Sequence, residues 1–231
     1  MGAIESAVVH DRGWVTSTTD ENGAAYTTQY GYDEMGRLSS KSYPTGDSTA
    51  WNTTTSSFVP VASSDYGIPT DHWRSTVQTG TGVKTTYYDA LWRPLITLTQ
   101  DTNDSTTKSF TVNRYDALGR MVFTSYPVAS LTSVNDALTG TATTYDALGR
   151  VRLIKQDSEL GVLTTNTEYL SGFQTRVTDP KLHVTTTTYQ VFDAPATEAP
   201  VSIASPGGVT TTIARDAFGK PLTVTRTGPG G

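Results

Sequence analysis

The feature that most constrains the fold of this chain is a short motif that recurs along it. Residues 115–121 have the sequence YDALGRM and residues 145–151 have the sequence YDALGRV. More or less complete copies occur at residues 32–38 (YDEMGRL), 88–95 (YDALWRPL), 189–195 (YQVFDAP) and 214–222 (ARDAFGKPL). The spacing indicates a repeat of about 28 residues, with one further copy hidden between Asp33 and Asp89.

Each copy has the pattern of a β-hairpin. A Thr-rich run such as 140–145 (GTATTY) precedes the motif, and a second alternating run such as 150–156 (RVRLIKQ) follows it. Asp at the first position of a type I turn accepts a hydrogen bond from the backbone N–H two residues on, and Gly at the fourth position tolerates a left-handed backbone. Tyr ends the first strand with a large packing ring. The residues assigned to this structural motif are Tyr32, Asp33, Gly36, Arg37, Tyr88, Asp89, Arg93, Tyr115, Asp116, Gly119, Arg120, Tyr145, Asp146, Gly149, Arg150, Asp216 and Gly219.

Two copies depart from the motif. Trp92 stands at the glycine position of its copy, which predicts a different turn geometry there, and Pro94 follows where a strand N–H is not needed. In the copy at 189–195 the aspartate has moved to the glycine position, Asp193. We expect these two turns to be the least regular.

The predicted fold is all-β. The chain contains 44 threonines, a residue suited to pleated strands. A lone hairpin is marginally stable, so tandem hairpins are expected to join into one continuous spiralling sheet. We expect a lead-in strand region at 1–23, a repeat domain at 24–226 with an irregular excursion at 39–83, and a Gly/Pro tail at 227–231. Open strand edges in such a sheet favour self-association.

Composition excludes several classes of function. The net charge is -5, so no positive field draws the chain to nucleic acid. Cysteine is absent, which removes disulfides, thiolate nucleophiles and Cys-based zinc sites. No apolar stretch is long enough to insert into a membrane, and the N-terminus lacks the pattern of a signal peptide.

The repeat units resemble a known family. YDEMGRL, YDALGRM and YDALGRV, with VTDPKLHVTTTTY at 177–189, closely resemble the YD repeats of bacterial Rhs proteins, also found in the shell-forming subunits of ABC-type toxin complexes and in animal teneurins. The resemblance spans residues 24–226 and implies a β-sheet that, in full-length members, closes into a hollow shell around a toxic C-terminal polypeptide. The self-cleaving end of the Rhs core and a toxin domain have no counterpart here, so a segment of a secreted or extracellular bacterial shell protein is expected.

No catalytic, cofactor or metal site is predicted. His10, His72 and His183 are too scattered for a paired metal site, and no known nucleophile motif occurs. Residues 101–106 (DTNDST) imitate the start of a calcium loop but lack its glycine and its final glutamate, so a polar hairpin loop is expected.

The recurring cation after each turn leaves two functions open. Arg37, Arg93, Arg120, Arg150 and Lys220 either pair with the turn aspartates or form a basic ladder able to hold sulfated glycans. The first hypothesis is a non-enzymatic shell segment, whose partners are the rest of the shell and an enclosed toxin polypeptide. The alternative is a carbohydrate-binding or cell-surface adhesion module, with candidate glycan contacts at Trp73, Trp92, Arg93, Arg120 and Arg150.

Overall fold

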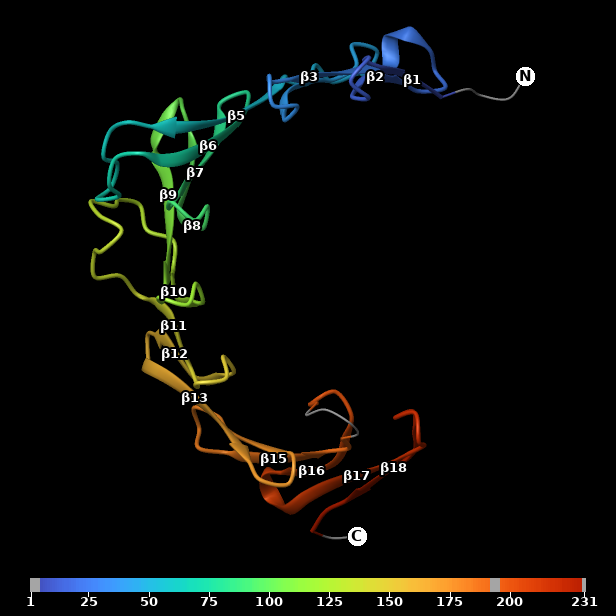
Figure 1. Ribbon diagram of the computed structural model, residues 1–231, viewed down its shortest axis with the longest axis vertical. Helices are drawn as coiled ribbons and strands as arrows, with labels where there is room; N and C mark the ends of the chain where they lie inside the picture. The colour runs from blue at the N-terminus through green and yellow to red at the C-terminus, as the bar shows by residue number, and fades with distance from the viewer. Residues whose placement is uncertain (1–4, 192–195, 230–231) are drawn as a thin grey trace. The chain divides into compact units, whose positions relative to one another are not determined.

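The computed structural model describes residues 5–191 and 196–229, and the fold is all-β. Its regular elements are strands and two short 3₁₀ turns, η1 (Ala24–Tyr26) and η2 (Pro206–Gly208). In Figure 1 the strands follow one another in chain order within each unit, as tandem hairpins. The predicted fold class of tandem β-hairpins is therefore confirmed.

The chain divides into two compact units, and the first consists of residues 1–114 and 125–138. Its strands are β1 (Ser6–Val9), β2 (Val15–Thr19), β3 (Thr27–Tyr32), β4 (Leu38–Ser42), β5 (Thr54–Val61), β6 (His72–Thr79), β7 (Gly82–Tyr88), β8 (Pro94–Asp101) and β9 (Asp104–Tyr115). Each strand from β1 to β8 pairs antiparallel with the next one along the chain. This order is expected when short turns connect alternating runs of residues.

The second unit consists of residues 115–124 and 139–231. Its strands are β10 (Met121–Ser125), β11 (Gly140–Tyr145), β12 (Val151–Ser158), β13 (Gly161–Leu170), β14 (Gln174–Thr178), β15 (Val184–Tyr189), β16 (Pro200–Ser205), β17 (Val209–Arg215) and β18 (Pro221–Thr227). From β11 to β17, each strand again pairs antiparallel with its successor.

In the first unit, loops fold over the sheet and form a core with it. In the first unit, Ile96 and Leu98 of β8 and Phe110 and Val112 of β9 are buried together with Tyr87 of β7. The loop at 62–71 contributes Ile68 to this core, and the segment at 126–138 packs Val128, Leu131, Val134 and Leu138 against it. All fully buried hydrophobic side chains of the described residues lie in this unit.

The second unit is a thin sheet by comparison. Its described residues contribute no apolar side chain to the fully buried set, and many of its large apolar side chains are exposed. Burial of apolar surface therefore contributes less to its stability, and the strand ladder and the contacts made at its turns contribute more.

The region at 39–83 contains regular strands and two longer connections, one before and one after β5 (Thr54–Val61). It includes β5 and β6, and these are joined by the loop at 62–71 that covers the core. A hidden copy of the motif was expected between Asp33 and Asp89, but this connection is built differently, around a turn in which Ile68 N–H donates to Asp65 O. The division into lead-in, repeat region and tail stays a prediction.

Candidate functional site

The repeated turn has one geometry. At the first YD copy, Gly36 N–H donates to Asp33 O over 3.0 Å and Asp33 N–H donates to Arg37 O over 2.9 Å. Gly36 has a φ of 79°. These bonds define a type I turn followed by a left-handed residue and a bulge, a common three-residue hairpin connection. The same pair of bonds closes the turns that begin at Asp89, Asp116, Asp146 and Asp216.

The aspartate side chain holds this turn together. In the copy at 146–150, Asp146 Oδ1 accepts hydrogen bonds from Leu148 N–H and Arg150 N–H, each over 2.9 Å. Its second oxygen, Oδ2, accepts from Arg150 Nε over 2.7 Å. The hydrogen bond from the Arg150 backbone N–H, with the arginine side chain, holds the pKa of the Asp146 carboxyl below its ordinary value, and partial burial opposes this shift. The carboxylate therefore fixes both the backbone and the arginine.

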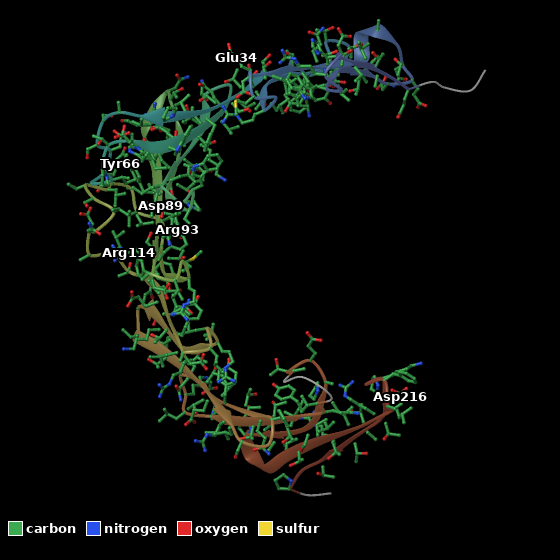
Figure 2. The ribbon with its side chains drawn as sticks, in the orientation of Figure 1. Glu34, Tyr66, Asp89, Arg93, Arg114 and Asp216 are labelled. Carbon is green, nitrogen blue, oxygen red and sulfur yellow. The ribbon has the colours of Figure 1, made fainter. Side chains whose placement is uncertain are left out.

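The turn with tryptophan at the glycine position keeps this geometry, so the prediction of another geometry was wrong. Trp92 N–H donates to Asp89 O over 3.0 Å, and Asp89 N–H donates to Arg93 O over 3.0 Å. Trp92 has a φ of 62°, so it occupies the left-handed region itself. Figure 2 labels the paired side chains Asp89 and Arg93, whose atoms Oδ2 and Nη2 lie 2.6 Å apart. The hydrogen bonds to Asp89 and the contacts of the Trp92 ring with Phe58 and Trp73 thus outweigh the cost of a non-glycine residue at this φ.

Two further turns of this geometry were missed from the sequence. Residues 10–14 (HDRGW) place His10 at the aspartate position and Trp14 at the arginine position, and His10 Nδ1 accepts from Arg12 N–H over 3.1 Å. Gly13 N–H donates to His10 O and His10 N–H donates to Trp14 O, each over 2.7 Å. The repeated motif has aspartate at its first turn position, so a histidine that presents a ring acceptor there does not match it.

The second missed turn is at residues 179–183 (DPKLH). Leu182 takes the glycine position with a φ of 65°, and its N–H donates to Asp179 O over 2.9 Å. His183 takes the arginine position, and its Nδ1 lies 3.1 Å from Asp179 Oδ2. His183 is therefore part of a turn. The leading Asp179 was the one signal in the sequence that pointed to it.

Several turns also contact the next hairpin. The Arg120 guanidinium lies over the Tyr145 ring, 4.7 Å from the centroid, and its Nη1 donates to Asp146 O over 3.3 Å. In return, the Tyr145 hydroxyl donates to Met121 O over 2.8 Å. Arginine and tyrosine of successive copies therefore lock one hairpin onto the next.

This lock between successive hairpins recurs at other turns, where other residues take some of its positions. Arg150 lies 3.8 Å from the ring centroid of Tyr169, whose hydroxyl donates to Val151 O over 3.1 Å. In the first unit, the Tyr32 hydroxyl donates to Val15 O over 2.7 Å, and the Tyr32 ring lies against Trp14 with centroids 5.3 Å apart. Tyr169 lies outside any YD copy, so the sequence did not identify it. Its position depends on the register between β12 and β13, which no local motif encodes.

The Arg37 side chain makes the corresponding contact with a phenylalanine. Its guanidinium lies 5.2 Å from the Phe58 ring centroid, and Nη2 donates to Phe58 O over 3.2 Å. Phe58 in turn stacks on Trp73, with centroids 5.0 Å apart, and touches Trp92 at 5.3 Å. The two candidate glycan-binding tryptophans therefore come together, but within an aromatic cluster that packs on itself.

The arginines do not form a basic ladder of free cations. The predicted pairing with the turn aspartate is present at four copies, with nitrogen to oxygen distances of 2.6 to 2.7 Å: Arg37 with Asp33, Arg93 with Asp89, Arg120 with Asp116, and Arg150 with Asp146. Lys220 contributes its backbone N–H to Asp216. This arrangement does not favour a site for sulfated glycans.

Other candidate sites from the sequence are placed as follows. His72 is buried, with Nδ1 2.9 Å from Pro69 O and Nε2 3.5 Å from Asp65 Oδ2. The loop at 101–106 is a polar hairpin connection in which Asp101 Oδ1 accepts from Asn103 N–H. Across the described ranges, no cluster of three or more potential metal ligands is found. Asp193 lies outside the described residues.

No helix in the part of the chain that the structure describes is long and apolar enough to cross a membrane.

The described polar side chains of the turns form hydrogen bonds with backbone groups and with each other. These hydrogen bonds and ion pairs can hold the strands of a hairpin, and successive hairpins, together. This structural role is the one that the geometry of the turns supports.

Part of the chain matches a family model, and most of it superimposes on solved structures. Residues 10–48 match the family model described as RHS Repeat. The crystal structure of TcdB2-TccC3 without its hypervariable C-terminal region superimposes with a TM-score of 0.58 at 14% identity, covering 97% of this chain and 12% of that one. The crystal structure of TcdB2-TccC3-Cdc42 gives a TM-score of 0.51 at 14% identity, covering 97% of this chain and 10% of that one.

At 14% identity, the structural likeness shows a shared fold. This chain spans about an eighth or less of the chains it superimposes on. A comparison with curated proteins finds no match.

Proposed function

We propose that this chain, a YD-repeat segment of the Rhs type, is a non-enzymatic structural part of a longer secreted bacterial polypeptide that encloses or presents a toxin polypeptide. The observation that carries the proposal is the lock between successive hairpins, in which Arg120 covers the Tyr145 ring and Tyr145 bonds back to Met121 O. At this contact, one hairpin contributes the arginine and the next contributes the tyrosine. A sheet built in this way can be lengthened by adding hairpins, as the wall of an enclosing structure requires.

The similar structures support this proposal. The better-fitting one is TcdB2-TccC3 without its hypervariable C-terminal region. This chain covers 12% of that structure, and we infer that it corresponds to a fraction of a wall and not to a whole enclosure. We therefore infer that the partners of this segment are neighbouring hairpins of the same wall and the polypeptide inside it.

The distribution of polar groups also supports a structural role. At four turns the arginine forms an ion pair with the aspartate of its own turn, so these cations stabilise the sheet. The carbohydrate-binding alternative requires free cations beside exposed aromatic rings, and no observation here favours it.

Solution mass tests the proposal. We expect light scattering on the 231-residue chain to show concentration-dependent association, together with far-UV circular dichroism rich in β-structure, because strands of an open sheet offer unpaired backbone groups. A heparin column serves as the control for glycan binding. A chain that stays monomeric across the concentration series and is retained by heparin would instead be a binding module.

A further inference from the structure

A buried histidine, His72, lies at the base of the loop at 62–71. It is the first residue of β6, it is 3% exposed, and it pairs with Val61, the last residue of β5. The loop between these two residues places Ile68 in the core of the first unit. A histidine buried here either finds hydrogen-bond partners for both ring nitrogens or leaves one of them unsatisfied.

The two ring nitrogens of His72 differ in their surroundings. Nδ1 lies 2.9 Å from Pro69 O. A carbonyl oxygen only accepts hydrogen bonds, so Nδ1 carries a hydrogen and donates it. In a neutral ring Nε2 then has no hydrogen and can only accept.

The atom that faces Nε2 is also an acceptor. Asp65 Oδ2 lies 3.5 Å from Nε2, and an ionised carboxylate has no hydrogen to donate. Both atoms are buried, and neither has a hydrogen-bond partner among the described residues. With a neutral His72, two buried acceptors face each other without a donor between them, which destabilises the closed loop. One proton on Nε2 satisfies both atoms at once.

The other polar side chains around this pair do not supply that hydrogen. Arg74 Nη1 lies 3.7 Å from Asp65 Oδ2, which is beyond hydrogen-bond distance. The Tyr87 ring centroid lies 5.9 Å from that of His72 and 5.4 Å from that of Tyr66. Burial, with the nearby Tyr66 and Asp65, raises the pKa of Tyr87 above its ordinary value of 10.0, so this phenol stays neutral near neutral pH.

Charged groups on the neighbouring segments are engaged elsewhere or exposed. Asp136, in the segment that covers the core, accepts hydrogen bonds from two backbone N–H groups of its own segment. Asp89 is paired with Arg93, and Asp71 is exposed. Histidine is the side chain whose charge ordinarily changes between pH 5 and 8, so His72 is the group here that can supply the missing hydrogen.

Two backbone hydrogen bonds report whether the loop is closed. Ile68 N–H donates to Asp65 O over 2.8 Å, and the Ile68 side chain is 2% exposed. Val134 N–H donates to Tyr66 O over 2.8 Å, which ties the loop to the segment that covers the core. Tyr66 is labelled in Figure 2. Both amides lose their partners when the loop lifts from the core.

We propose that His72 and Asp65 form a proton-controlled latch for the loop at 62–71. Protonation of His72 places a hydrogen between Nε2 and Asp65 Oδ2, and the resulting ion pair holds the loop on the core. Burial alone disfavours an imidazolium, but the facing carboxylate compensates its charge. The closed loop binds the proton more tightly than the open loop, so by linkage the proton stabilises the closed loop. The latch therefore holds at acid pH and is released as the pH rises.

Hydrogen exchange of the two reporting amides tests the latch. Their protection is corrected for the pH dependence of intrinsic exchange. We expect the amides of Ile68 and Val134 to be about tenfold better protected at pH 5.5 than at pH 8. The loop opens while the strands stay paired, so the melting temperature of the sheet does not report it. Equal protection at both pH values would overturn the proposal.

Ring ¹⁵N spectra of His72 add a readout that an ordinary structural histidine would not give. We expect a ring with its hydrogen on Nδ1 at pH 8 and a doubly protonated ring at pH 5.5. A neutral ring with its hydrogen on Nε2 at pH 8 would contradict the latch, because Nε2 would then donate to Asp65 without an added proton.

Asp65→Asn separates the proton from the shape of the contact. The amide of asparagine can donate to Nε2 of a neutral ring, so this variant should keep the loop protected at both pH values. A variant that retained the wild-type difference would show that Asp65 is not the partner of the proton, and the proposal would fall. His72→Gln, whose amide can likewise donate to Asp65, gives the same test if the asparagine variant does not fold.

His183→Gln is the matched control. His183 also faces an aspartate carboxylate, with Nδ1 3.1 Å from Asp179 Oδ2, but this pair is exposed and lies in the second unit. We expect the control to keep the wild-type pH dependence of the loop. Loss of that dependence in the control would mean that the effect does not arise at His72. All groups of the latch lie within the first unit, so its failure would leave the proposed structural function standing.

Discussion

The fourth residue of each turn shows how one side chain is constrained by the backbone. The turns at 33–37 and 146–150 have Gly36 and Gly149 in the left-handed region, with φ of 79° and 80°. Trp92 and Leu182 adopt the same region, with φ of 62° and 65°. A residue with a Cβ is disfavoured there by about 1–2 kcal/mol. The tryptophan gains contacts with Phe58 in return, whereas Leu182 is 80% exposed.

We therefore expect Leu182→Gly to stabilise the protein. The gain in the free energy of unfolding should be about 0.5–1 kcal/mol, because relief of the left-handed strain exceeds the extra entropy that glycine has in the unfolded chain. Urea unfolding followed by circular dichroism measures the change. Gly149→Leu is the reciprocal variant and should destabilise by about 1–2 kcal/mol. If both variants shifted stability in the same direction, the left-handed position would not control these turns.

At the scale of a hairpin, stability depends on contacts between successive copies. Tyr145 is the last residue of β11. Its hydroxyl donates a hydrogen bond to Met121 O of the preceding hairpin, and the Arg120 guanidinium lies over its ring. Tyr169 does the same with Arg150 and Val151. One tyrosine thus contributes a hydrogen bond and a cation–π contact to the interface between two hairpins.

Removing the hydroxyl alone should show how much this link contributes. We expect Tyr145→Phe to lower the free energy of unfolding by about 1 kcal/mol, because Met121 O loses its donor while the ring stays in place under Arg120. Thermal unfolding of the 231-residue chain measures the loss. The control is Tyr43→Phe, since the Tyr43 hydroxyl reaches Thr54 Oγ1 only at 3.3 Å. Equal effects at both positions would mean that the tyrosine link is no stronger than an ordinary side-chain contact.

The sequence predicts hairpins better than it predicts their contacts. Asp and Gly at fixed spacing act within five residues, so the turn at 116–120 is encoded locally. The Trp92 turn was mispredicted because its aspartate bonds suffice without glycine. The partners of Tyr169 depend on strand register, and the cover formed by 126–138 over β9 depends on long-range packing. Neither leaves a local pattern in the sequence.

At the scale of the molecule, stability is unevenly distributed. The first unit has a core around Ile96 and Val112, both of which are fully buried. The second unit has no fully buried apolar side chain among its described residues. Local opening costs least where few buried apolar contacts are broken. Hydrogen exchange should therefore differ between the two units.

We expect backbone amides of β8 and β9 to exchange at least about tenfold more slowly than those of β15 to β18, measured by mass spectrometry of peptides after timed labelling. Strand pairing is present in both regions, so a difference in rates would come from the covered core. Val112→Ala should reduce the protection of β8 and β9 while leaving β15 to β18 unchanged. Uniform protection across both regions would show that the loop-covered core does not set local stability.

The turn carboxylates link stability to pH in both units. At Asp33, Asp116, Asp146 and Asp179, the backbone N–H four residues on lowers the pKa of the carboxyl below its ordinary value of 3.8, and partial burial opposes this. Because the folded pKa is the lower one, these groups stabilise the fold above pH 3.8, and this stabilisation is lost as the pH falls through the folded pKa.

We therefore expect the melting temperature to stay nearly constant from pH 7 to about pH 5 and to fall steeply below about pH 4. Circular dichroism across this range measures it. A variant with asparagine at all four aspartates should melt lower at pH 7 and show a much flatter acid dependence, since the amide does not titrate. If that variant kept the wild-type acid transition, carboxylates elsewhere would control it. The turn aspartates would then act through their hydrogen-bonding shape and not through their charge.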